Sequence, residues 1–385
     1  MDQFEIIVPT LFGLESLTAR ELKWLGYPDT TVEDGRVTFL GDWNAVLRAN
    51  LWLRTGERVL IKVGSFEAET FDDLFEQTKA LPWSRWLPKD AKFPVKGYSL
   101  KSTLASVRDC QAIIKKAVAA SLEQDYGISW FPEEGALYQI QFAFMKNTVT
   151  LMIDTSGEGL HKRGYRRVSN AAPLRETIAA AMVMLSYWKF EYPFADPFCG
   201  SGTIPIEAAM FKRNIAPGLS RHFAAQSFSA IPEILWTEAR EEAMAKKRDL
   251  PLLMQVSDLD PEAVRLAAGN AELAGVADAI QPVVKNALDF SSELAYGTVI
   301  TNPPYGERMG NRTECESLYR AFGKTYSKLE NWSCYVLTSH EQFETLFGKR
   351  ANKKRKLYNG MLKCNLYQYW GEKPPKKQHL NNIKD

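Results

Sequence analysis

The feature that most limits the possible folds is the stretch from Thr301 to Arg308, which reads Thr-Asn-Pro-Pro-Tyr-Gly-Glu-Arg. It follows Gly297 to Ile300, a short apolar run rich in β-branched residues that predicts a buried strand. Two consecutive prolines forbid continuation of the strand and disfavour a helix. The strand must therefore end in fixed groups: an amide side chain, a carbonyl and an aromatic ring. These groups are suited to hold a flat ring that carries an amine.

A glycine turn from Asp196 to Thr203 is the second constraint. It lies between a predicted strand and the predicted helix from Ile204 to Lys212, where polar cofactors bind in α/β sheets. Gly200 and Gly202 allow the backbone to bend tightly and to approach a ligand closely. Asp196 places a carboxylate in the same crevice.

The sequence of this turn excludes two common types of phosphate-binding turn. No Gly-Lys-Ser/Thr follows, so the turn is not a P-loop. Pro205 stands where a dinucleotide fingerprint has its third glycine, and an acid beside the turn would repel a pyrophosphate. The acid favours a ligand with an ammonium group, and S-adenosylmethionine has one together with a sulfonium.

Further candidate contacts follow the next two predicted strands. In Asp258-Leu259-Asp260-Pro261, Asp260 directly precedes a proline and is predicted to cap a helix. Asp258 is then free to accept hydrogen bonds from ribose hydroxyls, and Leu259 to cover an adenine. The amide of Asn286 can bond the adenine edge, although a loop asparagine is more often only a turn former.

The order of elements divides the chain. Residues 1 to about 165 predict two small α+β layers in tandem. From Ala172 onward strands and helices alternate, which is typical of a parallel, doubly wound sheet. Asn359-Gly360 lies between two apolar runs and predicts an antiparallel hairpin at the end of that sheet.

Bulk properties narrow the possible partners. A chain of 385 residues predicts two or three domains, and its net charge of +2 means that a nucleic acid must be met by local basic patches. Five dispersed cysteines suggest free thiols in a reducing compartment and no metal site. Neither a signal peptide nor an 18-residue apolar stretch is evident, so we expect a cytoplasmic protein that does not enter membranes.

Two basic segments are candidate RNA contacts. The loop from Gly159 to Arg167 is punctuated by glycines and contains Lys162, Arg163, Arg166 and Arg167. The stretch from Lys349 to Lys377 contains ten basic residues and one acid, with interleaved aromatic rings. The alternative interpretations are a solvated interdomain linker for the first and a solvated hairpin face for the second.

Asp-Pro-Phe-Cys-Gly-Ser-Gly-Thr and Asn-Pro-Pro-Tyr-Gly-Glu-Arg, in this order, resemble the signatures of class I S-adenosylmethionine-dependent amino-methyltransferases. The whole chain is similar to a narrower family, the bacterial THUMP-domain RNA methyltransferases. This family includes the large-subunit rRNA guanine-N2 methyltransferases and relatives labelled N6-adenine-specific DNA methylases. The stretches Gly159 to Arg167, Ala172 to Thr177 and Lys356 to Gly360 extend the resemblance over nearly the full length.

The resemblance implies three domains: ferredoxin-like (1–65), THUMP (66–165) and a Rossmann-like methyltransferase domain (166–385). It implies transfer of a methyl group from S-adenosylmethionine to guanine N2, with 23S rRNA as the first expected substrate. The alternative reactions are methylation of guanine N2 in tRNA and of adenine N6 in a nucleic acid. The last alternative is a non-catalytic RNA-binding or assembly factor. The implied catalytic residues are Asn302, Pro303, Pro304 and Tyr305. The implied cofactor residues are Thr177, Asp196, Phe198, Gly200, Gly202, Asp258, Leu259, Asn286 and Ala287. Within the two basic segments, the candidate RNA contacts are Lys162, Arg163, Arg166, Arg167, Lys353, Lys354 and Arg355.

Overall fold

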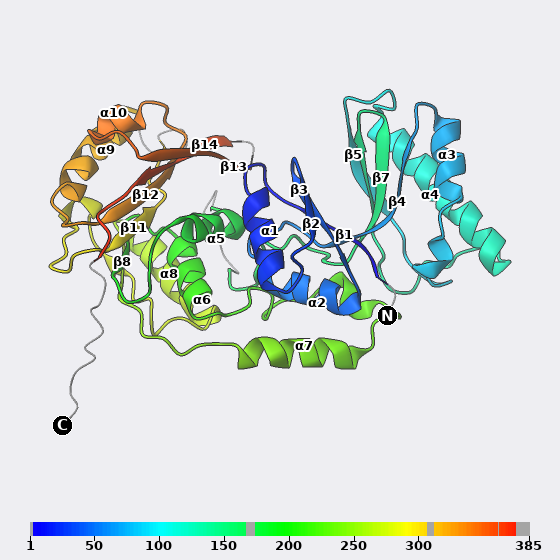
Figure 1. The fold of residues 1–385 in the computed structure, drawn as a ribbon, viewed down its shortest axis with the longest axis horizontal. Coiled ribbons are helices and arrows are strands. Elements are labelled where there is room, and N and C mark those ends of the chain that lie inside the picture. Colours follow the sequence, from blue (N-terminus) through cyan, green and yellow to red (C-terminus); the bar gives the residue numbers. More distant parts are fainter. Residues whose placement is uncertain (1–2, 167–173, 306–311, 361, 375–385) are drawn as a thin grey trace. The chain divides into compact units, whose positions relative to one another are not determined.

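The computed structural model describes residues 3–166, 174–305, 312–360 and 362–374. The chain divides into two compact units, and each contains a seven-stranded sheet (Figure 1). Unit 1 consists of Met1–Arg163 and Ile215–Lys247, and unit 2 of Gly164–Asn214 and Arg248–Asp385. Each unit is described separately below.

The sheet of unit 1 has the strand order β2-β3-β1-β4-β7-β6-β5. Its strands are β1 (Phe4–Pro9), β2 (Thr30–Glu33), β3 (Arg36–Gly41), β4 (Leu60–Glu67), β5 (Val95–Leu100), β6 (Ile140–Met145) and β7 (Thr148–Asp154). β4 pairs with β1 at one end and with β7 along its length, so it belongs to both halves of the sheet. The two α+β layers expected in tandem are therefore continuous through one strand.

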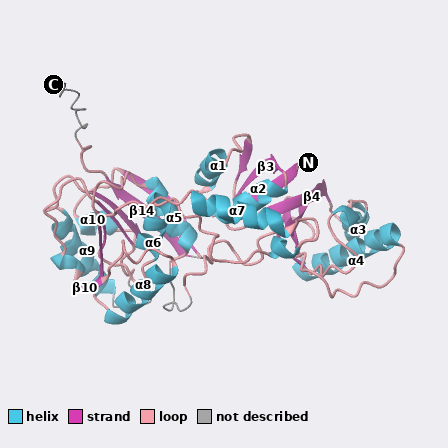
Figure 2. Ribbon diagram, turned by 90° about the horizontal axis from the view of Figure 1, so that it is seen from below, coloured by secondary structure: helices cyan, strands magenta, loops and turns pink. Residues whose placement is uncertain are grey.

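The helices of unit 1 bury one large apolar core against this sheet. They are α1 (Glu15–Trp24), α2 (Trp43–Trp52), α3 (Phe71–Lys79), α4 (Val107–Tyr126) and α7 (Glu233–Ala245), with short 3₁₀ turns η1 (Trp83–Arg85) and η2 (Ala224–Ser227). α3 and α4 lie side by side (Figure 2). Thr70 and Asp73 form a capping box at the start of α3, which satisfies two backbone donors of its first turn.

Residues 215–247 lie between two stretches of unit 2 in the sequence but belong to unit 1 in the structure. We call this segment the excursion. Phe228 stacks on Tyr138 with ring centroids 4.0 Å apart, and Trp236 stacks on Phe223 at 5.3 Å. Both Phe228 and Trp236 are buried in the core of unit 1. These residues lie within the predicted domain 166–385 in the sequence, and their apolar side chains pack in the core of unit 1.

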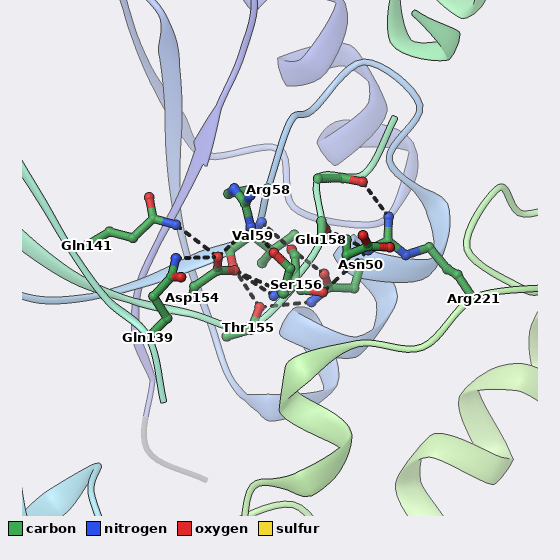
Figure 3. Close-up of polar contacts among 12 residues, drawn as sticks. Asn50, Arg58, Val59, Gln139, Gln141, Asp154, Thr155, Ser156, Glu158 and Arg221 are labelled. Carbon is green, nitrogen blue, oxygen red and sulfur yellow. Dashed lines mark hydrogen bonds and ion pairs between the residues drawn. The ribbon is translucent and has the colours of Figure 1, made fainter. Parts of the chain in front are cut away.

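The excursion also holds the loop that follows β7 (Figure 3). The buried guanidinium of Arg221 donates to the carbonyl oxygens of Gly159 (2.7 Å), Lys162 (3.1 Å) and Glu158 (2.6 Å). At the start of the same loop, Asp154 accepts from Arg58, Gln141 and the backbone of Ser156. Burial lowers the pKa of Arg221 to about 10, and the guanidinium remains charged at neutral pH.

The sheet of unit 2 has the order β10-β9-β8-β11-β12-β14-β13. Its strands are β8 (Phe194–Asp196), β9 (Met254–Asp258), β10 (Val283–Val284), β11 (Thr298–Thr301), β12 (Ser333–Thr338), β13 (Lys353–Asn359) and β14 (Leu362–Tyr369). Among the strands described in this unit, β14 alone runs against the others. The expected parallel sheet with a terminal antiparallel hairpin is confirmed.

Helices cover both faces of this sheet, α9 and α10 on one face and α5, α6 and α8 on the other (Figure 1). Their bounds are α5 (Glu176–Leu185), α6 (Thr203–Lys212), α8 (Pro261–Leu273), α9 (Arg312–Tyr326) and α10 (Phe343–Phe347), with the 3₁₀ turn η3 (Ala287–Asp289). Parallel strands β8, β9, β11 and β12 end at the same edge of the sheet, and this edge positions the site.

The expected boundary between residues 65 and 66 falls inside β4, and the exact domain limits stay a prediction. No helix among the described residues is long and apolar enough to cross a membrane.

Candidate active site

Asp196, the last residue of β8, is the central buried acid of the site. It is fully buried, and its Oδ1 accepts from the hydroxyl of Thr301 (2.6 Å) and from the backbone N–H of Phe198 (3.2 Å). Its Oδ2 is also buried but has no hydrogen-bond partner among the described residues. Burial raises the pKa of Asp196 to about 7, and the charge of Asp258 adds to the rise. Asp196 therefore presents an acceptor that a bound cation can satisfy.

The glycine turn needs both of its glycines. Gly200 and Gly202 have φ of +52° and +81°, a region that L side chains rarely adopt. A Cβ on Gly202 would also lie 3.0 Å from the Cβ of Ala267 in α8, whereas nothing lies within 4 Å of the corresponding position on Gly200. Gly202 thus permits close packing of α6 on α8, and Gly200 leaves open space for a ligand.

Asp258, at the end of β9, ties two loops together. Its Oδ2 accepts from the backbone N–H of Gly200 at 2.8 Å, and its Oδ1 accepts from the N–H of Asp260 at 3.1 Å. Asp260 in turn accepts from the N–H of Glu262 and caps α8, as its place before Pro261 predicts. The side chain of Leu259 is 67% exposed, so it is available to cover a flat group.

Asn286 occupies the position that was predicted to contact adenine. Its Oδ1 accepts from the N–H of Leu288 at 3.0 Å and begins the turn η3. Asn286 therefore acts as a turn former, and the buried Ala287 follows it. The adenine contact stays a prediction.

The Asn-Pro-Pro-Tyr turn leaves β11 directly beside the buried acid. Asn302 follows Thr301, whose hydroxyl binds Asp196. The hydroxyl of Tyr305 donates to Oδ1 of Asn302, and the carbonyl of Pro304 accepts from the hydroxyl of Tyr319 at 2.6 Å. The end of the motif, residues 306–308, lies outside the described residues.

Two of the predicted RNA contacts have partners within the protein. Arg163 is 2% exposed and donates to the carbonyls of Leu160 and Arg54, both at 2.6 Å, within unit 1. A direct contact of Arg163 with RNA does not fit this burial, because its charge is already held by backbone oxygens. Lys162 is exposed and pairs with Glu158.

Arg166 belongs to unit 2 and bridges two helix starts. It forms an ion pair with the buried Glu176 of α5 at 2.7 Å and donates to Oγ1 of Thr203 at the start of α6. It therefore holds α5, which contains the fully buried Thr177, against the glycine turn. Arg167 lies outside the described residues.

The hairpin register shows where the C-terminal basic residues lie along the sheet. Lys353 pairs with Gln368, which pairs with Tyr335 near the start of β12, so Lys353 lies toward the amino edge of the sheet. Lys354 forms an ion pair with Glu344, and Arg355 is partly buried. Among the described lysines of this hairpin, the exposed Lys356 and Lys363 lie closest to the carboxyl edge, and sequence reasoning did not single them out.

Sequence reasoning also missed Thr301 and Tyr319. Alternation along β11 gives Thr301 no special status, and only pairing of β11 with β8 brings its hydroxyl to Asp196. Tyr319 resembles any apolar position of an amphipathic helix. Among the described residues, no group of three His, Cys, Asp or Glu side chains could hold a metal ion.

This strand order, glycine turn and Asn-Pro-Pro-Tyr turn define a class I methyltransferase domain. A family model described as the RMKL-like methyltransferase domain matches residues 163–368. Models of the RlmL ferredoxin-like domain and of the THUMP domain match residues 5–60 and 68–154. The chain belongs to this family of RMKL-like methyltransferases with an N-terminal ferredoxin-like and THUMP region.

Relatives extend over the whole chain. YpsC of Bacillus subtilis (strain 168), named as a candidate RNA methyltransferase, is 46% identical over 99% of this chain and 100% of its own. A Listeria monocytogenes structure, described as a predicted N6-adenine-specific DNA methylase, is 48% identical with a TM-score of 0.92, covering 97% of each chain. The structure of SMU.472, a candidate methyltransferase complexed with SAH, is 40% identical with a TM-score of 0.92, covering 97% of this chain and 100% of the other.

S-adenosylmethionine fits the described residues on their own geometry. The partnerless Oδ2 of Asp196 matches an ammonium group, and the open space beyond Gly200 admits a ligand beside the turn. The family confirms the expected cofactor, since SAH is what remains when S-adenosylmethionine gives up its methyl group.

Proposed function

We propose that this protein transfers a methyl group from S-adenosylmethionine to the exocyclic N2 of a guanine in 23S rRNA. One observation carries the proposal: Asn302 and Pro303 follow β11 next to the buried Asp196. The groups that can accept the target amine and the glycine turn therefore lie at the same edge of the sheet. The THUMP match and the name of YpsC support RNA as the substrate, and an RNA substrate favours a cytoplasmic location.

The cofactor would be held by the edge of β8 and β9. Asp196 accepts from the ammonium, Gly200 and Gly202 lie along the methionine part, and Asp258 accepts from the ribose hydroxyls while keeping its bond to Gly200. Phe198, Leu259, Asn286 and Ala287 surround the remaining surface, and Thr177 reaches the carboxylate. When bound, the cofactor supplies an electrophilic methyl group on its sulfonium.

The target amine needs activation because its lone pair is delocalised into the ring. Oδ1 of Asn302 and the carbonyl of Pro303 accept its two hydrogens, which favours a localised lone pair. Preorganised groups of this kind contribute about 3 kcal/mol each in catalytic sites. Alignment of amine and methyl group contributes a further 7–11 kcal/mol or so for well-oriented reactants. The methylated amine passes its surplus proton to water, and because this cation is strongly acidic, no strong general base is required.

The target base must leave its helix or lie in a loop to reach this edge. The ring of Tyr305 offers a stacking face, worth roughly 1–3 kcal/mol per base. Guanine and adenine both present an NH₂ group, so the choice of guanine rests on family resemblance. Methylation of tRNA at guanine N2, and of adenine at N6, are the alternatives, the latter favoured by the description of the Listeria relative.

RNA contacts are proposed for two surfaces. One is the THUMP region of unit 1 with the exposed Lys162. The other is the basic hairpin, where Lys356 and Lys363 lie nearest the carboxyl edge and Lys353, Lys354 and Arg355 lie farther along the strands. Such side chains contact phosphates and fix the register of the RNA without reading its sequence.

The test uses the full-length protein, labelled S-adenosylmethionine and RNA from a strain that lacks this gene. After digestion, mass spectrometry identifies the modified nucleoside, and fractionation before digestion separates rRNA from tRNA. N2-methylguanosine in 23S rRNA is the expected product. N6-methyladenosine, or label only in tRNA, would overturn the proposed target. Asn302→Ala is the control: it should lose transfer and retain cofactor binding in calorimetry.

A further inference from the structure

The turn from Asn302 to Tyr305, which we call the acceptor turn, is held from behind by a buried tyrosine whose hydroxyl bonds to Pro304 and Thr338. Tyr319 lies in α9, is fully buried, and donates its hydroxyl hydrogen to the carbonyl of Pro304 at 2.6 Å. The same hydroxyl lies 3.1 Å from Oγ1 of Thr338, the last residue of β12. A single phenol thus joins the ends of two neighbouring parallel strands, β11 and β12.

The direction of each hydrogen bond in this group follows from its acceptors. A carbonyl can only accept, so the hydroxyl hydrogen of Tyr319 goes to Pro304. The hydroxyl of Thr338 must then donate to Tyr319, while it accepts from the backbone N–H of His340 at 3.1 Å. The result is a directed chain from His340 through Thr338 and Tyr319 to Pro304, in which each bond polarises the next.

This chain determines the direction of the proposed amine acceptor. The carbonyl of Pro303 lies in the plane of its peptide bond with Pro304. The ring of Pro304 fixes φ near −65°, and the bond from Tyr319 fixes its carbonyl and therefore ψ. Because φ and ψ of Pro304 are both fixed, the Pro303 carbonyl cannot rotate freely relative to Pro304.

The ring of Tyr319 is itself immobilised. It packs edge-on against Phe343 at 5.0 Å and against the imidazole of His340 at 5.6 Å. Burial raises the pKa of Tyr319, so its hydroxyl keeps the hydrogen that it donates.

We propose that Tyr319, oriented by Thr338, is a positioning residue that sets the Pro303 carbonyl for the target amine. The inference rests on the proposed transfer to an exocyclic amine. It assigns Tyr319 to orientation of the acceptor turn and not to binding of cofactor or RNA.

The chain offers a matched control on the same helix. Tyr326 is also buried in α9, and its hydroxyl also donates to a backbone carbonyl at 2.6 Å, that of Trp332. Trp332 directly precedes β12, at the opposite edge of the sheet. Tyr319→Phe and Tyr326→Phe therefore remove the same atom and the same kind of bond, and only the first affects the acceptor turn.

The experiment compares kcat, KM for RNA and the dissociation constant of S-adenosylmethionine for wild type and both variants. We expect Tyr319→Phe to lower kcat by up to about a hundredfold, the cost of a misplaced reacting group, with KM for RNA and the dissociation constant of S-adenosylmethionine close to wild type. Thr338→Val should lower kcat in the same direction by less, and Tyr326→Phe should leave it unchanged. Equal kcat for the two phenylalanine variants would overturn the inference.

A second measurement does not depend on activity. Crystal structures of both variants should show the Pro304 carbonyl turned away from its wild-type direction in Tyr319→Phe only. An unmoved carbonyl in that variant would contradict the positioning role, whatever the substrate. Failure of the proposed function is recognised separately, as a wild-type protein that labels no RNA.

Discussion

The hydroxyl of Tyr305 donates a hydrogen bond to Oδ1 of Asn302, the oxygen proposed to accept the target amine. This hydroxyl therefore satisfies the acceptor that the substrate is expected to use. The base must displace the hydroxyl before its amine can bind, and the ring is then available for stacking.

This relationship predicts different results for two changes at one position. Tyr305→Phe retains the ring and releases Asn302, so KM for RNA should be equal to or lower than that of wild type. Tyr305→Ala removes the stacking face and should lower kcat/KM by about 5- to 150-fold, corresponding to 1–3 kcal/mol. Steady-state kinetics on the same RNA measure both. Equal losses in the two variants would show that the hydroxyl, and not the ring, is what the reaction requires.

The pKa of Asp196 predicts how cofactor affinity depends on pH. An ammonium ligand binds the ionised carboxylate, and with a pKa of about 7 the ionised fraction rises about eightfold between pH 6 and 7.5. Calorimetry should find a similar gain in affinity for S-adenosylmethionine over this range. Asp196→Asn should bind more weakly and without this dependence; a variant that kept the wild-type slope would assign the titration to another group.

The same shift predicts the pH dependence of folding without cofactor. Since the folded-state pKa of Asp196 is raised, the unfolded chain loses this proton first, between about pH 4 and 7. The free energy of unfolding therefore falls as the pH rises through this window, by about 4 kcal/mol at most. In Asp196→Asn this loss of stability should be absent. Denaturant titrations at pH 5 and pH 8 compare the two proteins.

Residues 215–247 are predicted to stabilise unit 1 and not unit 2. The backbone N–H of Arg248 donates to the carbonyl of Arg213 at 2.8 Å, so the excursion leaves and rejoins unit 2 at one point. A short Gly-Ser linker in its place should preserve S-adenosylmethionine binding, whereas unit 1 should become protease-sensitive and RNA affinity should fall. Loss of cofactor binding would mean that unit 2 also needs the excursion.

Two single substitutions test whether this segment stabilises unit 1 without removing it. Trp236 is buried on Phe223, so Trp236→Ala should lower the free energy of unfolding by about 3–5 kcal/mol. Ile234 lies on the same helix but is 58% exposed, and Ile234→Ala should stay within about 0.5 kcal/mol of wild type.

The hairpin register predicts which lysine contacts RNA. Lys363 is exposed near the carboxyl edge, and Lys328 is exposed between α9 and β12 at the other edge. Lys363→Ala should weaken RNA binding and reduce the slope of log K against log salt by about 1, the value for one lost phosphate contact. Lys328→Ala should change neither. Filter binding at several salt concentrations measures both, and identical slopes would place the RNA elsewhere.

Much of the site was predictable because its residues are adjacent in sequence and constrain the backbone directly. Two prolines end β11 at Asn302 whatever surrounds them, and Pro261 leaves Asp260 as the cap of α8. Gly202 is required by a positive φ, which is a local property of the turn. The strand pattern and the Asn359-Gly360 signal similarly predicted the sheet and its hairpin.

The basic residues show where such reasoning failed. Lys162 and Arg163 are neighbours of like charge, yet one is exposed and the other is buried against backbone carbonyls. Charge predicts that a side chain needs partners, but not whether water, RNA or the chain itself provides them. Arg166, likewise a predicted RNA contact, forms an ion pair with Glu176 and donates to Thr203 at the start of α6.

By itself, then, the sequence determined the two turns, the acids beside them and the family, because proline, glycine and capping residues act through local torsions. Only the tertiary structure decided that residues 215–247 complete unit 1, that Thr301 binds Asp196 and that Tyr319 holds Pro304. Each of these is a contact between residues far apart in the chain, and its geometry depends on strand register and helix packing. No local pattern encodes that geometry.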